Sequence, residues 1–335
     1  KAEIKLYEQY IEALRSADCA ATFGHLGEEF GGRFPLTGVG DTDLSAYFSE
    51  LATKLVSNTG RAGLVVPTTI FPGKTCNRFP IASDQRFSLV TIGKSSQVDY
   101  VPLSFNFNNL EDPRTHILMT GDDLKLMNPN TKTCPIIRSQ RDMDIHRKIY
   151  SNVPVLCRNS TERNLDSWNI SFSSMFHRTN DSSLFYTERF DGAVPLYVGS
   201  FMYQFDDRYE SFDHDSKGNK VIRYVSDNEK TNKFEIEPEF WVDHKEVNNK
   251  WLRKGYNKPW VLGFRDVSNV RNERTLIACV LASSFAFSNT VNLILVGDLD
   301  DRMSSCLLAN LNSLVSDYCT KNKSSGRHVN QFVLE

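Results

Sequence analysis

The sequence lacks an apolar run long enough to cross a membrane. Its longest apolar-rich stretch, residues 276–287, includes Ser283 and Ser284 and is shorter than the roughly 20 residues that a helical span requires. Internal repeats and low-complexity tracts are also absent. The chain has 335 residues and a hydrophobic content of 40%, which is enough for two domains with cores of their own.

Closely spaced cysteines are missing as well. The sequence has seven cysteines but no C-x-x-C pair, so neither a disulfide framework nor a zinc site is expected. This usage favours reduced thiols, a cytoplasmic protein and no bound metal. The cysteines are spread along the whole chain, at Cys19, Cys76, Cys134, Cys157, Cys279, Cys306 and Cys319.

The chain has no overall excess of positive charge. Its formal net charge is −2, which excludes a uniformly basic nucleic-acid-binding protein but not a local basic surface. Residues 245–274 form such a stretch, with eight lysines and arginines against three carboxylates. Tyr256 and Trp260 lie among these cations.

Hydrophobic spacing predicts an α/β first half. Amphipathic helices are expected at residues 3–17 and 43–57, because their apolar residues recur at helical intervals. Residues 60–67 contain a short continuous apolar run that is typical of a buried parallel strand, and a second strand is expected at 87–92.

The amino-acid composition changes near residue 150. Polar and aromatic residues become frequent there, and short strands are expected to outnumber helices. Residues 211–232 are polar and loop-like, and a single helix is expected to close the chain at residues 301–321. The segment 128–131, N-P-N-T, is expected to be a turn.

The most informative segment is residues 260–275, W-V-L-G-F-R-D-V-S-N-V-R-N-E-R-T. It places Arg265, Arg271 and Arg274 among amide and hydroxyl side chains, between two apolar runs. Guanidinium and amide groups are the usual donors to phosphates and base edges. The alternative is a salt-bridged strand end, because local charge clusters are usually solvated.

Six blocks of sequence together resemble one protein family. The block G-F-R-D-V-S-N-V-R-N-E-R-T at 263–275 is one of them, and L-N-S-L-V-S-D-Y followed by G-R-H-V-N within 308–330 is another. P-L-Y-V-G and Q-F-D-D-R-Y within 195–209 form a third, and the others lie at 33–52, 60–70 and 77–93. In this order they are similar to large bacterial adenine-specific DNA methyltransferases of restriction–modification systems, whose catalytic motif is N-P-P-Y.

The resemblance implies that the chain corresponds to the C-terminal part of such an enzyme. Residues 1–150 would then complete the Rossmann-like methyltransferase sheet, and residues 151–335 would form an α+β target-recognition domain. The family's methyl donor is S-adenosylmethionine, bound at a Gly-rich turn upstream of these blocks. That turn and N-P-P-Y are both absent here, and the lone G-x-G at 38–40 lacks the preceding strand that a cofactor turn needs. The cofactor would therefore be held mainly by residues outside this chain.

Phe79 is the candidate catalytic-pocket residue. Methylation of the adenine amine requires the base to leave the duplex and to be held between flat apolar groups. Phe79 precedes the second expected strand and occupies a position that resembles the family's stacking loop. The alternative is that Phe79 simply fills the core.

The candidate DNA-binding residues lie in the second half. Arg265 and Arg271 are the first choices, Arg274, Lys254 and Lys258 would contact phosphates, and His328 is a further phosphate candidate. Alternatively, Arg271 and Arg274 pair with Asp266 and Glu273, and His328 is a structural hydrogen bonder. Asp206, Asp207 and Arg208 are expected to form a structural network. Sequence readout is expected in the less motif-like residues 210–247.

The resemblance implies site-specific adenine-N6 methylation of double-stranded DNA in a bacterial restriction–modification or phage-defence system. The enzyme's N-terminal half or other subunits of the system are possible protein partners, and no membrane is involved. Two alternatives remain at this point: a non-catalytic DNA-binding specificity subunit, and a protein-interaction scaffold that has lost DNA binding.

Overall fold

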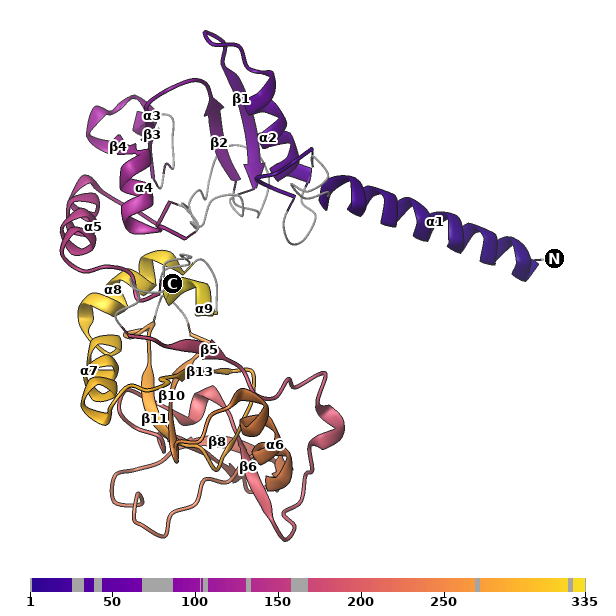
Figure 1. Ribbon diagram of the computed structural model, residues 1–335, viewed down its shortest axis with the longest axis vertical. Coiled ribbons are helices and arrows are strands. Elements are labelled where there is room, and N and C mark those ends of the chain that lie inside the picture. Colours follow the sequence, from indigo (N-terminus) through magenta and orange to yellow (C-terminus); the bar gives the residue numbers. More distant parts are fainter. Residues whose placement is uncertain are drawn as a thin grey trace. The chain divides into compact units, whose positions relative to one another are not determined.

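The chain forms two compact units. The computed structural model describes residues 2–25, 33–38, 44–67, 87–102, 104, 108–130, 134–157, 168–268, 272–324 and 328–334. One unit comprises residues 1–123 and 137–143, and the other comprises 124–136 and 144–335 (Figure 1). Both mix helices with small sheets, so a mixed α and β protein is confirmed. The sheets of the described residues have two to four strands, nearly all paired antiparallel, and a Rossmann-like sheet is not confirmed.

Both helices expected at the start of the chain are present. The first is longer than predicted: α1 spans Ala2–His25, and its apolar residues Ile4, Tyr7 and Ile11 are exposed. The second, α2, spans Leu44–Leu55 and contributes the buried Tyr47, whose ring stacks on Phe34 with centroids 4.5 Å apart.

The strands that follow are present, but the expected parallel pairing was wrong. β1 (Ala62–Pro67) pairs antiparallel with β2 (Phe87–Ile92). Val66 is buried while Val65 is 60% exposed, which is the alternation of a sheet with one face toward solvent. A short apolar run cannot by itself distinguish the two pairings. The other elements up to residue 152 are β3 (Gln97–Tyr100), α3 (Asn108–Glu111), a 3-10 turn (Pro113–Thr115), β4 (Ile117–Thr120), α4 (Gly121–Met127) and α5 (Gln140–Asn152), and β3 pairs antiparallel with β4.

The second unit is built on a four-stranded antiparallel sheet in the order β11-β10-β13-β5. A three-stranded sheet, β12-β6-β9, lies in the same unit and contains the parallel pair β12–β6. The strands are β5 (Ser171–Ser173), β6 (Ala193–Tyr197), β9 (Trp241–Asp243), β10 (Trp260–Arg265), β11 (Ala278–Ala282), β12 (Ala286–Phe287) and β13 (Val291–Leu295). The helices are α6 (His244–Lys254), α7 (Asp301–Leu311), α8 (Leu314–Lys323) and α9 (Gln331–Leu334), with 3-10 turns at Ser182–Leu184 and Gly199–Phe201.

Strand β10 is buried on both faces. Val261 packs into a cluster that includes Phe176, Tyr197 and Phe287, whereas Leu262 and Phe264 face a second cluster with α7 and α9. Figure 1 shows α7 alongside β10 and β11. Because successive side chains of a strand point to opposite faces, one strand supplies both cores.

Glycine at position 263 allows this close packing. A Cβ atom at Gly263 would lie 2.5 Å from Leu281 Cδ1 and 3.3 Å from Val291 Cγ1. Neighbouring strands therefore fill the space that a side chain would need, and any larger residue would have to displace them.

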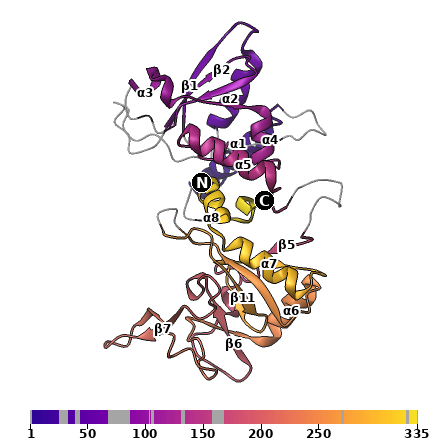
Figure 2. The same ribbon diagram turned by 90° about the vertical axis from the view of Figure 1, so that its left-hand side faces the viewer.

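Residues 211–232 contain a β-hairpin, so the expectation of a polar loop was wrong for its first half. β7 (Glu210–His214) pairs antiparallel with β8 (Lys220–Tyr224), and the connecting turn has Gly218 at a φ of 78°. Figure 2 shows β7 reaching to the side of the second unit. Ser211, Asp213 and Asp215 alternate with less polar residues. The segment is therefore polar on average, and its composition alone does not indicate a strand.

The closing helix is divided in two. The expected single helix at 301–321 consists of α7 and α8, separated at Asn312 and Ser313. Ser313 caps α8 by accepting a hydrogen bond from Ser316 N, and Asn312 turns away to bind the backbone of Ala278 through both its side-chain atoms. The bend directs the buried Asp317 toward the chain before β11, where its Oδ1 accepts hydrogen bonds from Thr275 N and Leu276 N at 2.7 and 2.8 Å.

Removing the Asp317 carboxylate is predicted to destabilise the second unit. Asp317→Ala leaves two buried N–H groups without acceptors, and we expect the free energy of unfolding to fall by about 3 kcal/mol. Asp317→Asn keeps one acceptor oxygen and should lose about 1 kcal/mol. Urea unfolding measures both, with the exposed Asp301→Ala as the control, expected to change stability by less than about 0.5 kcal/mol. Equal effects of the two alanine variants would contradict this role.

Candidate functional site

Two of the sequence blocks, 195–209 and 308–330, meet at the backbone of Ala278, the first residue of β11. The side chain of Asn312 accepts a hydrogen bond from Ala278 N at 3.1 Å and donates one to Ala278 O at 2.8 Å. Gln204 Nε2 donates to Asn312 O at 3.2 Å, and Phe205 N donates to Ala278 O at 3.2 Å. Residues separated by more than 100 positions are thus tied together by polar contacts, and much of the motif content serves as scaffold.

Arg265 ends β10 on the face toward β6. Its backbone N donates to Ile277 O. A Cβ atom at Gly199 would lie 2.5 Å from Thr290 O and 3.3 Å from Arg265 Cγ, so the arginine stem packs closely against Gly199. Burial raises the pKa of the nearby Glu210 carboxyl, and the charge of Arg265 partly offsets this. Arg265 Nε is buried and has no hydrogen-bond partner among the residues that the structure describes.

Further unpartnered polar atoms cluster close by in sequence. Ser268 Oγ, Arg274 Nη1 and Thr275 Oγ1 are also buried without a hydrogen-bond partner among the described residues. Buried polar groups in proteins are nearly always hydrogen-bonded, so such a concentration in residues 265–275 requires an explanation. Because these atoms are also closed to solvent, a ligand that presents acceptors would reach them only if the segment opened.

Asp266 points to the opposite face of the sheet from Arg265. Its Oδ2 lies 2.7 Å from His328 Nδ1, and its Oδ1 accepts a hydrogen bond from Asn292 Nδ2 at 3.2 Å. Val267 and His328 also form a backbone bridge. The expected alternative for His328, a structural hydrogen bond, is present, and the imidazole is still 59% exposed.

The Asp266–His328 pair lies in an open polar cleft of about 520 Å³. Its lining includes His177, Asp266, Asn289, Asn292, His328 and Gln331. Gln331 Nε2 and Asn292 Oδ1 are 3.4 Å apart, and Asn289 Oδ1 accepts from Arg178 N at 3.3 Å. The lining is rich in amides and imidazoles, which both donate and accept hydrogen bonds and suit a polar ligand.

Lys254 and Lys258 are engaged within the unit. α6 ends at Gly255, whose φ of 63° terminates the helix, and Lys254 Nζ then reaches Ser173 Oγ at 2.5 Å. Burial and, secondarily, the charge of Lys250 lower the pKa of Lys254. Lys258 Nζ donates to Leu299 O at 2.6 Å and lies 5.2 Å from the centre of the Trp260 ring.

The structure does not bring all the candidate cations together. Lys258 precedes the start of β10 and Arg265 ends it, so roughly 17–20 Å of strand separates them. Arg265 and His328 are associated with opposite faces of the sheet. Arg271 and Phe79 lie outside the described residues.

The acidic block after Phe205 forms the structural network that the sequence suggests. Asp206 Oδ1 accepts from Arg208 N at 2.9 Å, and Asp206 Oδ2 lies 2.7 Å from Lys230 Nζ. Arg208 Nε is 3.5 Å from Asp207 Oδ1. These charges neutralise one another and hold the turn around residues 203–206.

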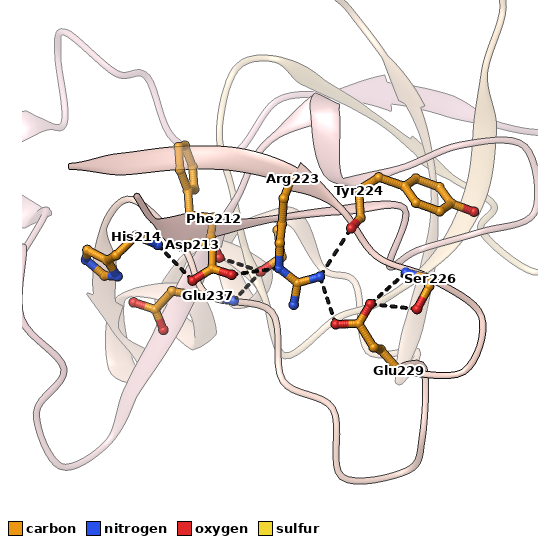
Figure 3. Close-up of polar contacts among 9 residues, drawn as sticks. Phe212, Asp213, His214, Arg223, Tyr224, Ser226, Glu229 and Glu237 are labelled. Atoms are coloured by element: carbon orange, nitrogen blue, oxygen red, sulfur yellow. Dashed lines mark hydrogen bonds and ion pairs between the residues drawn. The ribbon is translucent and has the colours of Figure 1, made fainter. Parts of the chain in front are cut away.

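The β7–β8 hairpin carries a second charged network, shown in Figure 3. Arg223 Nε donates to Asp213 Oδ2 at 2.9 Å across the strands, and Arg223 Nη1 lies 2.8 Å from Glu229 Oε1. Glu229 in turn accepts from Ser226 N and Oγ. The guanidinium is therefore held by two carboxylates in the free protein, which balance its charge.

Lys323, a half-buried lysine at the end of α8 that packs against Tyr150 of α5, is not indicated by the sequence pattern. Burial lowers the pKa of Lys323 to about 8, and its Nζ lies 5.3 Å from the centre of the Tyr150 ring. Cys319, one helical turn earlier, hydrogen-bonds Tyr150, and burial raises the pKa of its thiol. The i, i+4 spacing of Cys319 and Lys323 places them on one face of α8, but only the packing of α5 reveals that this face is covered.

Comparisons with protein families and with curated proteins identify no relative of this chain. No protein-family model matches the chain, and no curated protein matches its sequence. Among the helices that the structure describes, none combines the length and apolar composition of a membrane span.

The low pKa of Lys323 predicts a pH-dependent stability. The folded-state pKa of about 8 lies below the unfolded value near 10.5, so the unfolded chain binds more protons between these values. The Lys323 contribution to stability therefore rises with pH across this window, by at most about 1.4 kcal/mol per pH unit, and its full penalty remains below pH 8.

Lys323→Met removes this titration, and chemical unfolding from pH 7 to 10.5 measures the result. The stability of the variant relative to wild type should be greatest at pH 7 and decline through the window. The exposed Lys245→Met is the control and should track wild type at every pH. Parallel curves for Lys323→Met and wild type would show that Lys323 titrates normally.

Proposed function

We propose that this chain is the C-terminal, DNA-recognising part of a bacterial adenine-N6 DNA methyltransferase from a restriction–modification or phage-defence system. The observation that carries the proposal is the segment 260–275. It resembles the family's G-F-R-D block in sequence, and it holds four buried polar side-chain atoms without partners among the described residues, two of them on arginines. Double-stranded DNA offers a dense array of acceptors, and these groups would reach them once the segment opens to admit the duplex.

Arg265 and Arg274 are the strongest phosphate or base contacts in this proposal, because their guanidinium groups retain unused donors. Arg271, between them in sequence, completes the set. Lys254 and Lys258 would act as peripheral phosphate contacts. Each ammonium donates one hydrogen bond within the unit and has further donors, since an ammonium carries three N–H groups.

His328 would contact DNA through the cleft. Its Nδ1 is occupied by Asp266, which leaves Nε2 to face a phosphate or a base edge. Asn289 and Gln331 line the same cleft, and carboxamide side chains can make paired hydrogen bonds with adenine. Because Asp266 fixes the imidazole, its orientation would be set before DNA arrives.

The chemical step is assigned to polypeptide outside this chain. S-adenosylmethionine supplies the methyl group when it is bound, but the Gly-rich turn and the N-P-P-Y motif are absent from the sequence. The residues present therefore do not fit a complete cofactor site. In this proposal the chain positions DNA, and Phe79 remains the candidate for stacking on the displaced adenine.

The second candidate function is a non-catalytic specificity subunit that acts beside a separate modification chain. The absence of both catalytic motifs from this sequence favours it. The two candidates share DNA binding and differ in whether a single polypeptide methylates.

Methyl transfer from labelled S-adenosylmethionine to mixed-sequence duplex DNA distinguishes them, using the natural full-length polypeptide. Label in N6-methyladenine is the expected result. Salt-sensitive DNA binding without label would favour the specificity subunit, and absence of both would overturn the proposal.

Arg265→Ala is predicted to weaken duplex binding and to reduce its salt dependence. Loss of one phosphate contact should lower the slope of log affinity against log salt concentration by about 1. Fluorescence anisotropy with a mixed-sequence duplex at several salt concentrations measures this slope. The matched control is Arg302→Ala, an exposed arginine of α7 that should leave the slope unchanged. An unaltered slope in Arg265→Ala would remove Arg265 from the interface.

A further inference from the structure

The turn at residues 203–206 presents an aromatic side chain in an unfavourable way. Phe205 has a φ of 60°, and the residue is 64% exposed. Glycine or asparagine normally occupies such a backbone conformation, as Asn169 does elsewhere in the described chain. A bulky apolar residue is here both conformationally strained and exposed to water, although glycine would remove both penalties.

The turn that holds Phe205 is rigid. Tyr203 N donates to Asp206 O at 2.8 Å, and Asp206 N donates to Tyr203 O at 3.1 Å, which closes a two-residue turn with Phe205 at its second central position. Phe205 N is bonded to Ala278 O, and Gln204 to Asn312 O. Three backbone hydrogen bonds and one from the Gln204 side chain hold the turn, so Phe205 has only its side-chain torsions left to order when a ligand binds.

The surroundings of the turn suit nucleic acid. Ile277 O binds Arg265 N on one edge of β11, and the next carbonyl, Ala278 O, binds Phe205 N on the other edge. Arg265 is linked to the turn through Tyr209, which lies close enough to feel the charge of the guanidinium. Tyr203, at the base of the turn, stacks on Tyr209 with ring centroids 4.7 Å apart.

The residues that follow Phe205 are charged and paired with one another. The exposed apolar area at Phe205 is therefore a single phenyl ring bordered by charged residues. A surface that docks another protein usually has a broader apolar patch.

We propose that Phe205 is a wedge that inserts between stacked bases of the DNA duplex. The inference rests on the proposed DNA-binding function and extends it to a residue and a role. Apolar side chains inserted at a base step unstack it and kink the duplex, and an enzyme that needs an adenine outside the helix requires that unstacking. In this proposal the strained backbone at Phe205 is retained because the phenyl ring stacks on the base that loses its neighbour when the step opens.

The experiment compares binding of the full chain to an intact duplex and to the same duplex with one abasic site. An abasic site provides the gap that a wedge must otherwise open, so wild type should bind the abasic duplex roughly tenfold more tightly, in line with the worth of one base–aromatic stack. Phe205→Gly and Phe205→Asn should lose this preference. Phe205→Tyr should keep it.

Two controls separate the wedge from folding and from general binding. Glycine and asparagine both tolerate a positive φ, so the melting temperatures of these variants should stay within about 3 °C of wild type. Tyr186→Ser removes another exposed aromatic side chain of the same unit and should leave the preference intact.

Retained salt-sensitive binding with an unchanged abasic preference in Phe205→Gly would overturn the wedge and leave the proposed function standing. Absence of duplex binding by wild type would overturn both. Loss of self-association in Phe205→Gly without any change in DNA affinity would assign the residue to a protein contact and would also overturn the wedge.

Discussion

Burial of β10 on both faces is the constraint on which the second unit depends. Val261 faces one core and Leu262 and Phe264 face the other, so the strand can carry polar side chains only at its ends. Glycine at 263 lets the neighbouring strands approach closely enough to close both cores. The polar candidate residues near β10 therefore lie outside its buried centre. Lys258 lies before the strand, and Arg265 and Asp266 lie where it ends. Alternation then sends Arg265 toward Glu210 and Asp266 toward His328.

The sequence predicts local structure well where one periodicity dominates, as in α2 and in the strands β1 and β2. It fails where a tertiary contact decides. The direction of pairing between β1 and β2 is not encoded in a short apolar run, and the break at Asn312 follows from the two hydrogen bonds of its side chain with Ala278. Ser313 is a good helix N-cap, which is a signal that could have marked the break. The hairpin β7–β8 is missed because its polar residues are held in cross-strand ion pairs such as Arg223–Asp213.

The candidate site is only partly predictable for a related reason. Counting charges in residues 245–274 identifies a basic stretch, but it cannot tell which cations are already in use. Lys250 pairs with Asp181, and Lys254 and Lys258 donate to Ser173 and Leu299. Arg265 and Arg274, by contrast, keep unpartnered guanidinium atoms within the described part of the chain. The distinction depends on contacts with residues up to 81 positions away, as for Lys254 and Ser173, which no local pattern contains.

The contacts of the motif residues bear on where specificity would reside. Asn312, Asp317 and Gln204 bind backbone groups, and a residue committed to the backbone cannot also discriminate between bases. These residues fix the positions of the strands, whereas the turn at 203–206 and the hairpin β7–β8 carry side chains into solvent. Exchange of the exposed side chains in these segments would leave the hydrogen bonds of Asn312 with the Ala278 backbone intact. A scaffold that is fixed by backbone contacts can therefore accept new exposed residues without losing its fold.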